Sequence, residues 1–79
     1  MMDQEQLKEE QRKMRLLRTM VDLTSAILMQ GNLTTPEAIE LVRATKKGVL
    51  DLFPDKEDVY DLIYRPRFER IINEKLEQN

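Results

Sequence analysis

The chain has 79 residues, with 13 lysines and arginines against 15 aspartates and glutamates, and it contains no histidine, cysteine or tryptophan. This composition excludes disulfides, the usual ligands of zinc and iron–sulfur clusters, and catalysis by a histidine or cysteine side chain. The length allows one small domain, which is marginally stable unless its helices pack well or a partner chain covers it.

The first predicted helix covers residues 3–30 and ends where Gly31 can adopt the left-handed conformation. Residues 1–13 form a charged N-terminal arm with one large apolar residue, Leu7, and residues 14–79 form a single helical domain. From residue 14 onward, two neighbouring apolar stripes cover about half of the helix circumference. They consist of Met14, Leu17, Val21 and Leu28, and of Leu16, Met20, Leu23 and Ile27. Such a wide face needs two neighbouring helices, either from this chain or from a second copy.

The second predicted helix covers residues 36–53. Thr35 is expected to be its N-cap, and Pro36 its first residue, where no N–H donor is needed. Gly48 lies inside this helix, where glycine costs about 1 kcal/mol relative to alanine, so we expect another helix to approach closely there. Its apolar side carries Ile39, Val42, Val49, Leu50 and Phe53.

The third predicted helix covers residues 56–78, with Asp55 as its N-cap. The ring of Pro66 would clash with the carbonyl four residues earlier, so we predict a break near this residue. The expected buried residues are Val59, Leu62 and Ile63 before the proline, and Phe68, Ile71, Ile72 and Leu76 after it. The pattern as a whole predicts an all-α fold, a small bundle of three main helices with the third broken near Pro66.

An acidic run at residues 55–61 lacks the glycine and the alternating spacing of a calcium-binding loop. Its acids occupy the first turns of a helix, where the helix dipole favours negative charge. We therefore predict no metal site and no cofactor. No nucleophile is paired with a base and no glycine-rich phosphate loop is present, so we expect no enzymatic activity and no small-molecule substrate.

The segment from Tyr64 to Arg70 places three arginines at the start of the last helical stretch, where the dipole disfavours positive charge. The arginines either pair with acids such as Asp58 and Asp61, or form a site for an anion or an acidic partner. Aromatic residues at four-residue spacing lie beside them, as core or as partner anchors. The predicted partner-binding residues are Tyr60, Tyr64, Arg65, Arg67, Phe68 and Arg70.

These features favour a small non-catalytic protein–protein interaction module (an adaptor, regulator or subunit) that binds another protein or a second copy of itself. We expect a homodimer through Met14, Leu17, Met20, Val21 and Leu28, with a closed monomer as the rival. The alternative function is a DNA-binding transcriptional regulator with a degenerate helix-turn-helix at residues 36–64. The acids that open its recognition helix would face phosphates unfavourably, so we expect no nucleic-acid partner.

The first residues are acidic and polar, unlike a signal peptide, and the longest apolar stretch is too short to span a bilayer. Small secreted domains are usually rich in disulfides. We therefore expect a cytoplasmic protein with no membrane partner.

Overall fold

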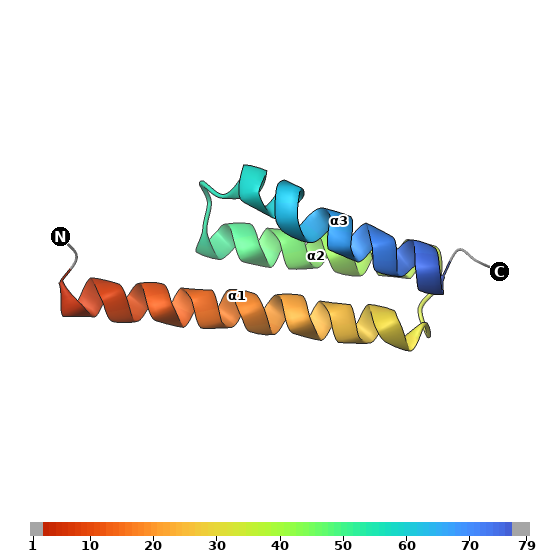
Figure 1. Cartoon of the computed structure of the whole chain (residues 1–79), viewed down its shortest axis with the longest axis horizontal. Helices are drawn as coiled ribbons and strands as arrows, with labels where there is room; N and C mark the ends of the chain where they lie inside the picture. The colour runs from red at the N-terminus through yellow and green to blue at the C-terminus, as the bar shows by residue number, and fades with distance from the viewer. Residues whose placement is uncertain (1–2, 77–79) are drawn as a thin grey trace.

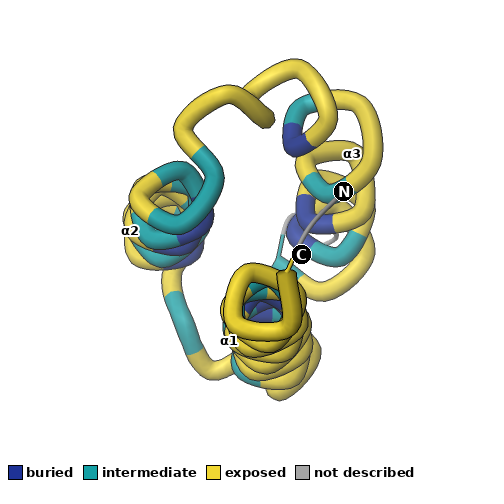
Figure 2. Tube along the Cα trace, turned by 90° about the vertical axis from the view of Figure 1, so that its left-hand side faces the viewer, coloured by how far each residue is buried: buried dark blue, intermediate teal, exposed yellow. Residues whose placement is uncertain are grey.

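The computed structural model describes residues 3–76 and contains three helices, α1 (Gln4–Gln30), α2 (Thr35–Leu52) and α3 (Glu57–Lys75) (Figure 1). The described residues form no strand, so the predicted all-α bundle is confirmed. Viewed along the long axis, the three helices occupy the corners of a triangle (Figure 2). The predicted end of the third helix at residue 78 lies outside the described residues.

Local capping chemistry fixes where α1 and α2 begin and end. Asp3 caps α1 through a reciprocal capping box with Gln6, and Gly31 ends the helix with a φ of 69°. Thr34, one residue before the predicted Thr35, caps α2. The reason is a pair of reciprocal hydrogen bonds with Glu37. The Thr34 backbone N–H donates to the Glu37 carboxylate, and the Glu37 backbone N–H donates to the Thr34 hydroxyl.

The predicted Asp55 cap of α3 is wrong. The Lys56 N–H donates to the Phe53 carbonyl at 3.1 Å, which closes a turn over Pro54 and Asp55 before the helix starts. Lys56 occupies the N-cap position and makes no side-chain capping bond. The acids of the first turn, Glu57 and Asp58, supply the favourable interaction with the helix dipole instead.

One stripe of α1 packs against both other helices. Its buried residues are spaced by alternating steps of four and three, which is the heptad spacing of packed helices. The two neighbours of this stripe therefore both come from the same chain, whereas Leu16 and Leu23 of the second predicted stripe remain 40% and 59% exposed. The apolar core consists of Leu17, Val21 and Leu28 from α1, Ala38 and Val49 from α2, and Tyr60, Phe68 and Ile72 from α3.

The predicted inner face of α3 is wrong before the proline. Val59, Leu62 and Ile63 are 42%, 77% and 49% exposed, whereas Tyr60 and Phe68 are almost fully buried. Each aromatic ring removes more apolar area from water on burial than any one of these aliphatic side chains does. After the proline, Phe68 and Ile72 are buried and Ile71 and Leu76 pack against the core, as predicted. On α2, Ile39 is exposed rather than buried.

Pro66 lies inside α3, which continues without interruption from Glu57 to Lys75. The proline therefore does not divide α3 into two helices. Its missing N–H leaves the Leu62 carbonyl without a helical partner. Both residues are exposed, so this carbonyl lies on the water-facing side of α3, where water can replace the lost hydrogen bond.

A polar contact and a small residue bring α2 close to α1. The buried hydroxyls of Thr24 and Thr45 are 2.6 Å apart, and Thr45 also donates to the Leu41 carbonyl at 2.9 Å. Thr24 must therefore be the donor to Thr45. A Cβ at Gly48 would lie 3.2 Å from the Met20 sulfur, which confirms the close helix approach predicted there.

We expect Thr45→Val to lower the free energy of unfolding by about 1–2 kcal/mol, because it leaves the buried Thr24 hydroxyl without its acceptor. Thr24→Val is expected to cost less, because Thr45 keeps its bond to the Leu41 carbonyl. The double variant should be less destabilised than the sum of the two, since neither hydroxyl is then left unpaired. Urea denaturation measures all three variants, and strictly additive losses would contradict this account.

Candidate functional site

An apolar pocket of about 220 Å³ opens at the end of the bundle where α2 turns into α3. We call it the end pocket. Its walls come from all three helices and the α2–α3 turn, and Lys56 is the charged residue on its edge. The lining residues are Met14, Leu17, Val49, Phe53, Lys56, Val59, Tyr60 and Tyr64.

Apolar side chains beside the end pocket remain open to solvent. Met14 is half exposed, and Val59 and Ile63 are exposed to a similar degree. Ile63 and Tyr64 form with Met14 a second hollow between α1 and α3, which also contains Arg18 and Arg67. We call Met14, Val59 and Ile63 the apolar rim. Clustered exposed apolar side chains of this kind are typical of interaction surfaces.

The first turns of α1 extend beyond the ends of α2 and α3, as the red and orange part of Figure 1 shows. This part belongs to the predicted charged arm, and the structure describes it as helix from Gln4 onward. Leu7 lies on it and is 49% exposed. Within the arm, the Arg12 guanidinium and the Glu9 carboxylate form an ion pair at 2.7 Å. The hydrogen bond that Arg12 donates holds the pKa of Glu9 below its usual value.

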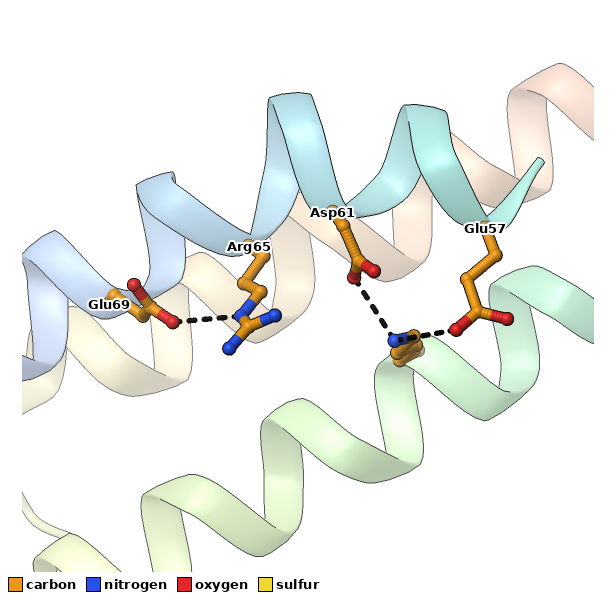
Figure 3. Close-up of polar contacts among 5 residues, drawn as sticks. Glu57, Asp61, Arg65 and Glu69 are labelled. Atoms are coloured by element: carbon orange, nitrogen blue, oxygen red, sulfur yellow. Dashed lines mark hydrogen bonds and ion pairs between the residues drawn. The ribbon is translucent and has the colours of Figure 1, made fainter.

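A second groove lies between α2 and α3, with both apolar and charged residues in its lining, and Lys46 on its α2 side pairs with two acids of α3. The Lys46 amine of α2 lies 3.0 Å from Asp61 and 3.4 Å from Glu57 (Figure 3). The contact with the Asp61 carboxylate is the main cause that raises the pKa of Lys46. The amine also lies 5.8 Å from the centre of the Tyr60 ring, a cation–π distance. These contacts hold α2 against α3.

The three predicted arginines do not form one cluster. Arg65 faces the α2–α3 groove and pairs with Glu69 at 2.9 Å, rather than with Asp58 or Asp61 (Figure 3). Arg67 faces the hollow beside α1, with its guanidinium 5.9 Å from the Tyr64 ring. Arg70 is exposed. Because their spacing spreads them around α3, the arginines do not converge on a shared anion.

Two of the predicted partner-binding aromatics are core residues. The rings of Tyr60 and Phe68 are 6.4 Å apart and almost fully buried, although Tyr60 also forms part of the wall of the end pocket. Tyr64, 6.0 Å from Tyr60, is partly buried and reaches the end pocket.

The predicted self-association residues are also mostly internal. Leu17, Val21 and Leu28 are buried by α2 and α3, and Met20 packs against the core. Of this set, Met14 is the one that is exposed. Sequence reasoning missed Val59 and Ile63 as surface residues because two stripes of α3 both have helical spacing. Which of the two stripes is buried depends on how the other two helices pack against α3.

Searches of protein-family models, of curated proteins and of solved structures found no match to this chain. Among residues 3–76, no helix combines the length and the apolar character needed to cross a bilayer. Within the same range, no three acidic side chains gather as they would to hold a metal ion. What the end pocket can bind therefore follows from its own geometry.

Tyr60 gives a pH-dependent test of the core beside the end pocket. Its hydroxyl is buried and has no hydrogen-bond partner among the described residues. Burial, and then the charge of Asp61, raise the pKa of Tyr60 to about 12. The unfolded tyrosine has its ordinary pKa near 10, so it ionises more readily than the folded one. The raised pKa of the folded tyrosine therefore makes the free energy of unfolding depend on pH. The stabilisation is fully present below about pH 10 and is lost as the pH rises towards about 12.

We expect Tyr60→Phe to raise the free energy of unfolding at neutral pH by about 1 kcal/mol, because it removes a buried hydroxyl that has no partner. Between about pH 10 and 12 the variant should lose less stability than the parent protein. Thermal denaturation across this pH range measures both effects. A destabilised variant would show that the hydroxyl is hydrogen-bonded in solution.

Proposed function

We propose that this protein is a small non-catalytic helical interaction module, an adaptor, regulator or subunit, that binds its partner through the end pocket and the apolar rim. The observation that carries this proposal is the half-exposed trio of Met14, Val59 and Ile63 beside an open apolar pocket. Covering apolar surface is favourable by about 25 cal/mol per Å². A partner that covers the rim would gain this free energy without requiring the bundle to rearrange.

The size of the end pocket supports a protein partner. Ligand sites for drug-sized molecules usually have volumes of roughly 300–1,000 Å³, whereas this pocket has about 220 Å³ and is open to solvent. That space suits a side chain or two from another protein. Its apolar walls favour an aliphatic or aromatic anchor of the kind that dominates protein interfaces.

The arrangement of α2 and α3 favours this proposal over the helix-turn-helix alternative. The two helices lie side by side and run in opposite directions (Figure 1), whereas the helices of a DNA-binding motif cross at about 90–120°. The first turn of α3 carries Glu57 and Asp58, which would repel phosphates. A cytoplasmic location is part of the proposal, since a chain of this size without cysteine lacks the disulfides that small secreted domains usually use.

Photo-crosslinking in cells tests the proposal directly. We expect a photoreactive amino acid at Val59 or at Ile63 to crosslink to protein, because both side chains lie at the proposed contact. The same amino acid at Lys47, an exposed position on α2 away from the end pocket, is the matched control. If the rim positions give no more crosslinked protein than Lys47, the rim is not a docking surface and the proposal fails.

A further inference from the structure

The packed stripe of α1 continues beyond the helices that cover it, with Leu7 and Met14 as apolar members and Glu10 as a charged one. Leu7, Glu10 and Met14 extend, by the same alternating steps of four and three, the stripe whose buried members are Leu17, Val21, Thr24 and Leu28. We call these seven residues the heptad stripe. Its first three members are exposed or partly exposed. A heptad stripe is the pattern that a packed helix requires, so the arm has the face of a packed helix without a neighbour.

Three hollows meet at Met14, which makes this residue the centre of a receiving surface. One is the end pocket, one lies between α1 and α3, and the third is a shallow hollow along α1 lined by Glu10, Gln11, Met14, Arg15 and Arg18. The cations that border these hollows outnumber the acids, Glu10 and Asp22. They are Arg15, Arg18, Lys56 and Arg67.

The first part of the arm of this same chain, residues 3–10, has the complementary charge, whereas Arg12 and Lys13 make its last residues basic. Between residues 3 and 10 it carries Asp3, Glu5, Glu9 and Glu10 against Lys8 alone, a net charge of −3. Its one large apolar side chain, Leu7, is exposed and matches the apolar end pocket in character. An acidic helix with a single leucine on its heptad stripe is thus suited to a basic surface with an apolar pocket.

We propose that the partner is a second copy of this chain, whose arm lies across Met14 and inserts Leu7 into the end pocket. The α1 helices of the two copies then run antiparallel, and each arm docks on the other copy in the same way, as two-fold symmetry requires. The acidic segment at residues 3–10 of each copy then faces the basic segment from Arg12 to Arg18 of the other. This inference rests on the proposed function, because it names the partner of the same site.

Sedimentation velocity over a concentration series tests this dimer on the full chain. We expect the parent protein to dimerise, and Leu7→Asp to weaken the dimer by at least about a hundredfold, because each dimer buries Leu7 twice. Leu7 lies outside the core, so the variant should keep the helical circular dichroism of the parent. Leu62→Asp is the matched control, since Leu62 is 77% exposed and lines none of the three hollows. It should dimerise like the parent.

Charge reversal tests the antiparallel pairing. One double variant carries Glu9→Lys and Glu10→Lys, and the other carries Arg15→Glu and Arg18→Glu. Each should be monomeric when alone, because its arm and its receiving surface then have charge of the same sign. Mixed together, the two should form a heterodimer, because each supplies the charge that the other lacks. A parent protein that stays monomeric, a Leu7→Asp dimer of parental strength, or a mixture that stays monomeric would overturn the second-copy proposal. The rim crosslinks would still decide whether another protein binds there.

Discussion

The structure depends on a difference in length between one helix and the two that cover it. α1 has 27 residues and α2 and α3 have 18 and 19, so at 1.5 Å per residue α1 is about 12–14 Å longer than the other two. Because the loop after Gly31 aligns the helices at one end, all of the excess appears at the other. The uncovered arm, the half-exposed Met14 and the end pocket are consequences of this one mismatch.

The polar contacts of the bundle hold the short helices in place relative to α1. The Thr24–Thr45 hydroxyl pair and the small Gly48 set α2 against α1, and Lys46 joins α2 to α3 through Asp61 and Glu57. These contacts fix the position along α1 at which the two short helices end. They thereby decide that Leu17 is covered and Met14 is not, which connects the packing of the core to the surface proposed for binding.

The sequence was sufficient for the bounds of the helices, apart from the break predicted near Pro66, and insufficient for the inner face of α3 before that proline. Gly31, Pro36 and Pro54 mark the breaks because their backbone chemistry is local, and the predicted helix bounds agree with the structure to within a residue or two over the described range. On α3, however, the stripe of Val59 and Ile63 and the stripe of Tyr60 and Phe68 both have helical spacing. Which stripe is buried depends on the space that the other two helices leave.

The residues of the candidate site divide in the same way. Some follow from the local sequence, and the surroundings of others depend on how the three helices pack. The sequence identified the charged arm and named Met14 as a self-association residue, but it did not single out Leu7 for binding. It placed Arg65, Arg67 and Arg70 together, although their positions around the helix direct them to different neighbours.

The most direct test of the second-copy docking is hydrogen exchange of the arm amides at low and high protein concentration. The account predicts that the amides of residues 5–13 become protected as concentration rises, while those of residues 20–28 stay unchanged. Arm exchange that is equally fast at every concentration would contradict it.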